Sequence, residues 1–260
     1  MNSNEILTLF DRKQRQEIEY PDMRKEVSPY VTRFIRPAPG LSLLLHSRLT
    51  ADIADRVIQE QMADFTQMQL PFTWKVYEYD RPADLGERLI SCGFEPDSDP
   101  PDAVMILDLL NVPPSLLTPV QGDVRRITHA DQLEDVIQVE QQVWGGSFEW
   151  IRARMGGHLE VPGYLSVFVA SVDQQPACTG WIYYNLKGGF ASLWGGSTVP
   201  DYRQQGLYTA VLAARVQEAI QRGYRFLTID AGAMSGPIVA RHGFQVLTHA
   251  TTYDWKIEEN

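Results

Sequence analysis

A proline-rich segment divides the sequence. Residues 111–119 read NVPPSLLTP and contain three prolines. Each proline fixes its own φ angle, lacks a backbone donor and disfavours helix in the residue before it. A chain of 260 residues is also long enough for two domains of ordinary size. The sequence therefore predicts domains at residues 1–111 and 122–260, joined by a linker at 112–121.

The composition is that of a folded, acidic protein. Hydrophobic residues make up 44% of the chain, enough for a packed interior. The formal net charge of −10 disfavours a nucleic-acid-binding surface. Cys92 and Cys178 lie far apart without zinc-type spacing, so we expect neither a disulfide scaffold nor a metal site. No signal-peptide core or membrane-length apolar run occurs, which predicts a cytoplasmic protein without membrane association.

The second part of the chain alternates between helical and extended patterns. Helices are predicted at 131–144, 148–156, 206–222 and 235–241, and strands at 165–172, 179–184, 190–199, 226–229 and 246–255. Glu134, Asp135 and Glu140 are predicted to lie on a solvated face of the first of these helices, although they are also candidates for attracting a cationic amine. Trp144, Trp150 and Trp194, with Tyr183 and Tyr184, are predicted as core residues, with the wall of an acceptor pocket as the alternative.

The first part shows a similar order. One or two surface helices are predicted within residues 1–20, followed by strands at 31–35, 41–45, 73–77 and 103–109 and helices at 51–68 and 83–91. The run from helix 51–68 to strand 103–109 includes the pair Gly93-Phe94, and the run from helix 206–222 to the last strand includes Gly243-Phe244. This order favours an internal repeat. The alternative is that both runs are common patterns of mixed folds.

The segment that most directly suggests binding joins strand 190–199 to helix 206–222. The first N–H groups of a helix have no partner within it, and the helix dipole makes that end electropositive. Gly206 permits close approach of a ligand to the backbone, and Arg203 adds a positive charge. These features favour a cradle for a phosphate or diphosphate, although the pattern GxxxxGK[ST] is absent. An ordinary turn capped by water is the alternative.

The sequence PDYRQQGL at residues 200–207 resembles the acyl-CoA loop of the GCN5-related N-acetyltransferases, whose pattern is [QR]-x-x-G-x-[GA] after a strand. The order of elements over 122–260 and the closing Gly243-Phe244 also resemble that family. The resemblance implies an α/β fold with a mixed sheet: an acyl-CoA N-acyltransferase domain in the C-terminal half and a truncated or degenerate copy in the N-terminal half.

The resemblance also implies roles for individual residues in binding acetyl-CoA. Arg203 occupies the first position of the pattern, and Thr198 and Val199 would offer backbone groups to the pantetheine arm. Ser235 would contact the thiol or the pantetheine, unless it is only a helix N-cap. The diphosphate would be held by backbone N–H groups of Gln204, Gln205, Gly206, Leu207, Tyr208 and Thr209.

The implied reaction is direct attack of an amine on the thioester in a ternary complex, without a metal. Strand 190–198 carries no carboxylate, so Asp230 is predicted as amine anchor or base, with a turn-capping role as the alternative. Tyr208 replaces the second small residue of the pattern and is a candidate to reach the acyl end. Val239 occupies the place where many relatives carry a tyrosine that protonates the thiolate.

Other functions stay open at this stage. A non-catalytic acyl-CoA-binding protein or sensor is one alternative, and an interaction scaffold without a ligand is another. The stretch 47–52 of the first copy lacks glycine and ends in Asp52, so that copy is not expected to hold CoA in the same way. The sequence specifies neither the acceptor, a small molecule or a protein amine, nor whether the chain forms a homodimer.

Overall fold

The computed structural model describes residues 1–38, 40–97 and 100–257. The chain forms two compact units. Unit 1 comprises Met1–Met105, Asp230–Ile238 and Val246–Asn260, and unit 2 comprises Ile106–Ile229 and Val239–Gln245. Late segments of the chain thus return to unit 1, and the proline-rich segment lies within unit 2. The domains at 1–111 and 122–260 and the linker at 112–121 stay predictions from the sequence.

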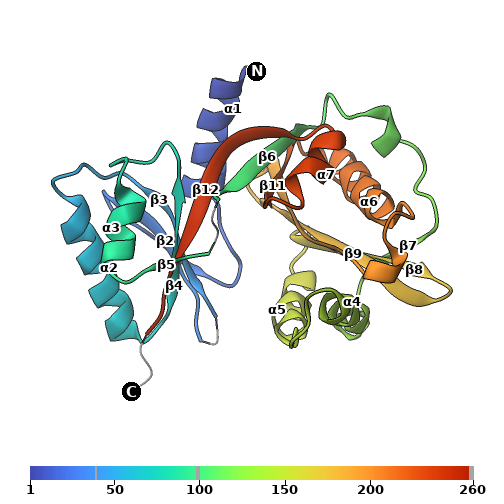
Figure 1. Ribbon diagram of the computed structural model, residues 1–260, viewed down its shortest axis with the longest axis horizontal. Helices are drawn as coiled ribbons and strands as arrows, with labels where there is room; N and C mark the ends of the chain where they lie inside the picture. The colour runs from blue at the N-terminus through green and yellow to red at the C-terminus, as the bar shows by residue number, and fades with distance from the viewer. Residues whose placement is uncertain (39, 98–99, 258–260) are drawn as a thin grey trace. The chain divides into compact units, whose positions relative to one another are not determined.

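The sheet strands of unit 1 neighbour one another in the order β1-β2-β3-β4-β12. Most of these pairs are antiparallel, and β3 and β4 are parallel. The helices α2 and α3 lie on one face of this sheet (Figure 1). The elements from the N-terminal part are α1 (Ser3–Phe10), a π-helical segment (Asp11–Gln16), β1 (Arg24–Val27), β2 (Val31–Ile35), β3 (Ser42–Ser47), α2 (Ala54–Met68), β4 (Phe72–Tyr77), α3 (Leu85–Ser91) and β5 (Glu95–Pro96). The last strand of the chain, β12 (Gln245–Trp255), completes the sheet by pairing antiparallel to β4.

The core of unit 1 forms where the apolar stripe of α2 packs on the sheet. Ile58 and Phe65 recur on one side of the helix and are fully buried against Phe72 and Trp74 of β4. The rings of Phe65 and Phe72 stack with centroids 4.1 Å apart. Complete burial of such side chains stabilises a fold by about 1.5–3 kcal/mol each. This packing fixes α2 as the crossover between β3 and β4.

The sheet strands of unit 2 are mixed in direction and neighbour one another in the order β7-β8-β9-β10-β11. Helix α6 covers one face of the sheet, and α4 and α5 cover the other (Figure 1). The chain enters this unit through β6 (Asp102–Asp108) and then forms β7 (Asp123–Ile127), α4 (Glu134–Trp144), α5 (Trp150–Leu159), β8 (Leu165–Val172), β9 (Gln175–Tyr184), β10 (Phe190–Thr198), α6 (Leu207–Gln221), β11 (Phe226–Ala231) and α7 (Gly236–Arg241).

The same series of pairings occurs in both units. In unit 1, β2 and β3 are antiparallel, and β3 is parallel to β4 with α2 between them. In unit 2, β9 and β10 are antiparallel, and β10 is parallel to β11 with α6 between them. Each parallel pairing consists of three residue pairs at the beginning of the two strands. The structure therefore contains two copies of one strand–helix–strand arrangement.

Most predicted elements are present with shifts of a few residues at their ends, and the mixed α/β fold is confirmed. Three strands were not predicted. β1 and β7, with sequences RKEV and DVRRI, are rich in charged residues and lack the alternation of a half-buried strand. β5 has only two residues. These strands form because a neighbouring strand supplies backbone partners, which the local sequence does not reveal.

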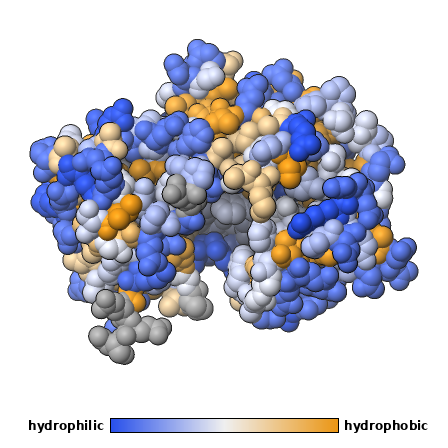
Figure 2. All heavy atoms as spheres, viewed as in Figure 1, coloured by the Kyte–Doolittle hydropathy of each residue, from blue (hydrophilic) through white to orange (hydrophobic). Residues whose placement is uncertain are grey.

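The surface is mainly hydrophilic on the face drawn in Figure 2, where hydrophobic residues occur in small groups among charged ones. Such a surface agrees with the 22% of charged residues in the sequence. None of the helices in the described ranges has the length and apolar character needed to cross a membrane.

The position of β12 gives a test of the fold. Ending the chain at residue 245 removes the antiparallel neighbour of β4, whose backbone pairs with β12 from Ala250 to Trp255. We expect unit 1 to lose cooperative unfolding and to become sensitive to proteolysis, because a strand's backbone groups need partners. Urea unfolding and limited proteolysis measure this. Ending the chain at residue 256 is the control, and equal behaviour of both truncations would contradict the topology.

Candidate functional site

The loop between β10 and α6 forms an exposed turn in unit 2. After β10 the chain makes a short 3₁₀ turn at Pro200–Tyr202 and enters α6 through Gly206, the N-cap residue. Gly206 has φ +81° and Gln204 has φ +63°, both in the left-handed region that glycine adopts without strain. The side chains of Arg203, Gln204 and Gln205 are exposed. The sequence thus makes a tight entry into the helix and keeps it open to solvent.

Six consecutive N–H groups in this loop have no acceptor within the described residues. They belong to Gln204, Gln205, Gly206, Leu207, Tyr208 and Thr209, and the first bond of the helix is from the Ala210 N–H to the Gly206 carbonyl, at 3.0 Å. A Cβ atom built on Gly206 meets nothing within 4 Å. Free N–H groups at an accessible helix N-terminus favour an anion there, because the helix dipole adds to them.

The strand that leads to the loop separates early from its parallel neighbour. β10 and β11 pair only at Phe190, Ala191 and Ser192 of β10, although β10 continues to Thr198. A β-bulge between Trp194 and Ser197 interrupts the register with β9 on the other side. Backbone groups in the second half of β10 are therefore not used by β11 within the described residues. An extended ligand can add to such a strand by backbone hydrogen bonds.

The corresponding loop of unit 1 is closed. The N–H groups of Ile53 and Ala54 both donate to the Thr50 carbonyl, at 3.2 and 3.1 Å. The Thr50 hydroxyl donates to the carboxylate of Asp52, which places negative charge near the start of α2. Leu49 is buried in the core of this unit. Two N–H groups at the helix N-terminus of the first copy are thus used within the chain, and the nearby carboxylate is unfavourable for an anion.

Tyr208, which replaces a small residue of the loop pattern, turns inward. Its ring lies against Gly196 of the β10 bulge, where a Cβ would come within 2.8 Å of it. The hydroxyl faces the buried guanidinium of Arg215, and burial is the main reason why the pKa of Tyr208 is raised. Arg215 donates to the carbonyls of Trp181 and Trp194, at 3.4 and 3.3 Å. The Tyr208 side chain therefore packs against the bulge, and its backbone N–H group remains among the free N–H groups of the loop.

Side-chain and backbone groups at the end of β10 already have hydrogen-bond partners. The Arg203 Nε donates to the Thr198 carbonyl at 3.1 Å, so this guanidinium is held beside the strand. The Val199 N–H donates to the carbonyl of Ala177 at 2.9 Å, and its carbonyl accepts the Tyr202 N–H at 3.0 Å. The Thr198 hydroxyl donates to Cys178 Sγ at 3.2 Å. The backbone contacts predicted for Thr198 and Val199 would have to share or replace these bonds.

The ion-pair partner of Asp230 and the hydrogen-bond partner of Ser235 both lie in unit 1. Asp230 forms an ion pair with Lys75 of β4. Burial is the largest influence on the pKa of Lys75 and lowers it. The charge of Asp230 is the next largest influence and raises it, and the pKa is raised overall. The Ser235 N–H and hydroxyl both contact the Gly232 carbonyl, at 3.1 and 3.4 Å. The structure thus brings the predicted residues from 198 to 209 together in unit 2 and places these two in unit 1.

Glu140 corrects one prediction, because it does not lie on a solvated helix face. Its side chain is buried on the sheet side of α4, whereas Glu134 is exposed and pairs with Arg152. Burial raises the pKa of Glu140 to about 7 from 4.5, against the opposing effect of hydrogen bonds from Ser197 and Trp144. The sequence contained a signal for this position: Glu140 follows Val136 and Ile137 by four and three residues on the apolar stripe of the helix.

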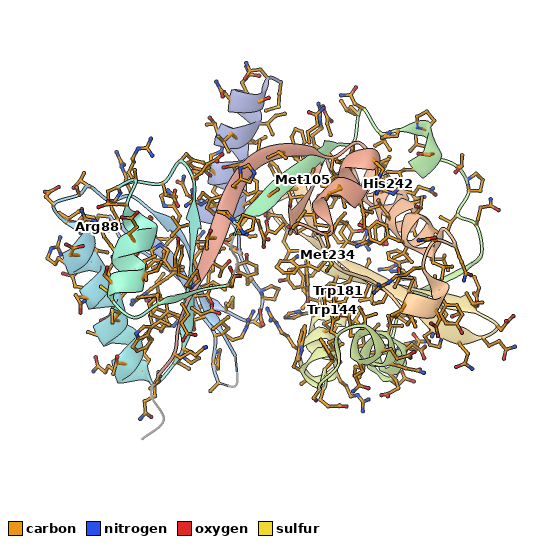
Figure 3. The ribbon with its side chains drawn as sticks, in the orientation of Figure 1. Arg88, Met105, Trp144, Trp181, Met234 and His242 are labelled. Carbon is orange, nitrogen blue, oxygen red and sulfur yellow. The ribbon has the colours of Figure 1, made fainter. Side chains whose placement is uncertain are left out.

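Tryptophans near these groups are exposed, contrary to a core role. Trp144 at the end of α4, labelled in Figure 3, is 60% exposed, and Trp194 on β10 and Trp150 at the start of α5 are about half exposed. Tyr184, in contrast, is fully buried.

His242, also labelled in Figure 3, lies near the start of α6. Its Nε2 is 3.4 Å from the Thr209 hydroxyl, and burial lowers the pKa of His242.

No group of three or more potential metal ligands occurs in the part of the chain that the structure describes. No protein-family model matches the sequence, and no curated protein matches it.

Solved structures with the same fold include acetyltransferases and a protein of unknown function. A GCN5-related N-acetyltransferase from Kribbella flavida matches 97% of this chain and 95% of its own with a TM-score of 0.68 at 14% identity. A functionally unknown conserved protein from Staphylococcus epidermidis matches 91% and 95% with a TM-score of 0.67 at 13% identity. A tandem protein of this kind from the clavulanic acid biosynthesis pathway matches 100% and 89% with a TM-score of 0.59 at 13% identity.

These matches establish the fold. The chain has the fold of the GCN5-related N-acetyltransferases, and the matches extend over both of its units. The resemblance that the loop and the element order indicated is confirmed at this level.

The ion pair of Asp230 generates a prediction about stability. Asp230→Asn leaves the ammonium of Lys75, which is 16% exposed, without its counter-charge. We expect the free energy of unfolding to fall by about 1–3 kcal/mol, less than for a fully buried pair. Urea denaturation measures the change, and Lys75→Met combined with Asp230→Asn should recover part of it because no lone charge remains.

The same variant separates this structural role from the predicted role in the reaction. If Asp230 only holds Lys75, the double variant restores both stability and turnover. If it also contacts the amine, turnover stays low in the double variant. A single variant as stable as the parent protein would show that the ion pair contributes nothing.

Proposed function

We propose that the protein is an N-acetyltransferase that transfers the acetyl group of acetyl-CoA to an amine. The observation that carries the proposal is the run of free N–H groups from Gln204 to Thr209 at the open end of α6. Acetyl-CoA has a diphosphate that suits these donors and a pantetheine arm that suits the part of β10 that β11 leaves unpaired. The fold supports the assignment, because the matches described above include a GCN5-related N-acetyltransferase and a tandem protein of that kind.

The reaction requires a neutral amine, a polarised thioester carbonyl and a proton for the departing sulfur. The amine lone pair forms the C–N bond as the C–S bond breaks, and the proton lost by nitrogen ends on the thiol. Gly195 and Gly196 lie in the bulge between the paired residues Trp194 and Ser197, where main-chain N–H groups leave the regular ladder. These groups are our candidates for polarising the carbonyl.

Unit 1 has a supporting role in this proposal. Its counterpart loop is closed by Thr50 and carries Asp52, so one CoA site per chain is expected. Trp144, Trp150 and Trp194 offer exposed aromatic surface for an acceptor, which is either a small molecule or a protein amine. The chain would work in the cytoplasm, where acetyl-CoA is available.

Binding of acetyl-CoA without transfer is the second candidate. Val239, at the place of the expected tyrosine, is buried and has no acidic proton. Asp230 is already paired with Lys75. Both observations favour a sensor, and release of free thiol in the presence of amines decides between the two functions. A panel of a polyamine, an amino sugar, an amino acid and a peptide covers the acceptor classes.

A charge reversal in the loop tests the binding site. Gly206→Glu places a carboxylate among the free N–H groups, so we expect acetyl-CoA affinity to fall about tenfold or more, which corresponds to about 1.4 kcal/mol. Isothermal titration calorimetry measures the affinity. For the parent protein, acetyl-CoA at about 100 times its dissociation constant should add about 2.7 kcal/mol of stability.

Gly223→Glu is the matched control. Gly223 lies just beyond the other end of α6, has φ +76°, and has open space around its missing Cβ, as Gly206 does. Both variants carry the same backbone strain and the same added charge. Equal affinities in the two variants would refute the site.

A further inference from the structure

The described part of unit 2 contains a buried carboxylate that the proposed function has not used. Glu140 is 4% exposed, and its Oε1 has no hydrogen-bond partner within the described residues. Leu133, Val136 and Ile137 on the same stripe of the helix are completely or almost completely buried. An apolar residue would be more favourable at this position, because burying a carboxylate without a cation is costly.

Glu140 faces the strand end that leads to the proposed CoA loop. Hydrogen bonds from Ser197 of β10 and from Trp144, one helical turn later, favour its ionised form. The Trp144 Nε1 also donates to Ser197 Oγ at 3.1 Å, which joins the three side chains in one group. Ser197 is the first paired residue after the bulge, beyond the point where β11 leaves β10. The carboxylate thus lies next to the part of β10 that is proposed to hold the thioester.

Among the described residues, no cation influences Glu140, whose pKa depends on burial, Ser197 and Trp144. On β9, the pKa of the Cys178 thiol is raised mainly by burial, and the charge of Glu140 also raises it. From α5, Arg152 pairs with Glu134 and His158 contacts Tyr183. Asp135 on α4 is partly exposed and pairs with Arg125, and Asp131 before α4 and Arg154 on α5 are exposed. Burial therefore dominates, and the pKa of Glu140 is raised to about 7, where a carboxylate can both accept and release a proton.

We infer that Glu140 accepts the proton which the acceptor amine must lose, through the hydroxyl of Ser197. The inference rests on the proposed function. The N–H bond of the ammonium breaks as its proton passes to Ser197 Oγ and the hydroxyl proton of Ser197 passes to the carboxylate, and the bonding electrons stay on nitrogen as its lone pair. The neutral amine then forms the C–N bond, the C–S bond breaks, and the second proton of nitrogen ends on the thiol. Solvent takes the proton from Glu140 before the next cycle.

Steady-state kinetics across pH test this assignment with acetyl-CoA and the best amine of the panel. In the parent protein, kcat/KM should rise with pH through an apparent pKa near 7. Glu140→Gln should lower kcat by about 100-fold or more and remove that rise, because the amide accepts no proton. The dissociation constant of acetyl-CoA should stay unchanged. Glu140→Asp should retain the pH-dependent limb with a reduced rate.

Two further variants separate a proton-transfer role from a structural one. Glu134→Gln makes the same change on the solvent side of α4 and should behave like the parent protein. Ser197→Ala keeps the buried carboxylate but removes the relay, so it should lose activity to a similar extent as Glu140→Gln. The Ser197 variant also keeps the proposal testable if Glu140→Gln does not fold.

Thermal melting gives a readout that does not depend on turnover. Burial holds the folded-state pKa of Glu140 above the unfolded value near 4.5, so its ionisation costs stability above about pH 7, and this cost disappears as the pH falls toward 4.5. The melting temperature of the parent protein should therefore rise relative to Glu140→Gln between pH 8 and pH 5. A constant difference would contradict the buried titration and overturn the inference.

The outcomes distinguish this inference from the proposed function. If the parent protein releases no thiol with any amine, the transferase proposal and the role of Glu140 are both overturned. If the parent protein turns over and Glu140→Gln keeps its rate and pH profile, only the role of Glu140 is overturned. Loss of rate and of the pH-dependent limb together, with unchanged acetyl-CoA affinity, supports both.

Discussion

The early separation of β10 from β11 is the constraint on which the candidate site depends. The two strands are parallel and joined by α6, so the chain must turn from the end of β10 directly into the start of that helix. Since pairing stops after three residues, the second half of β10 and the helix N-terminus are left with unused backbone groups. The backbone thus provides most of the proposed recognition, and side chains only shape it.

The same arrangement in unit 1 shows which details open or close such a site. β3 and β4 also part after three pairs, but the turn before α2 folds its N–H groups onto Thr50 and adds the charge of Asp52. Gly206 in unit 2 has no counterpart there, because stretch 47–52 lacks glycine. One fold therefore supports an anion-binding turn in one copy and a capped, structural turn in the other.

Two buried charged groups lie close to β10 in unit 2. Arg215 on α6 donates to the carbonyls of Trp181 and Trp194 beside the bulge and has Tyr208 as a neighbour. Glu140 on α4 is influenced by Ser197, which lies just after the bulge. Arg215 has a clear structural role because it supplies donors to main-chain carbonyls. Glu140 has an oxygen without a partner, which is why we assign it to proton transfer rather than to packing.

The sequence by itself determined the order of helices and strands, the loop at 198–209 and the resemblance in fold, because these depend on local periodicity, glycine and proline. Only the tertiary structure decided that β12 pairs with β4, that Asp230 is bound to Lys75, and that Glu140 is buried beside Ser197. Each of these depends on a residue distant in the chain, and no local pattern specifies such a partner. Glu140 lies on an apolar stripe that was visible in the sequence, but the tertiary structure alone showed that no cation among the described residues offsets its charge.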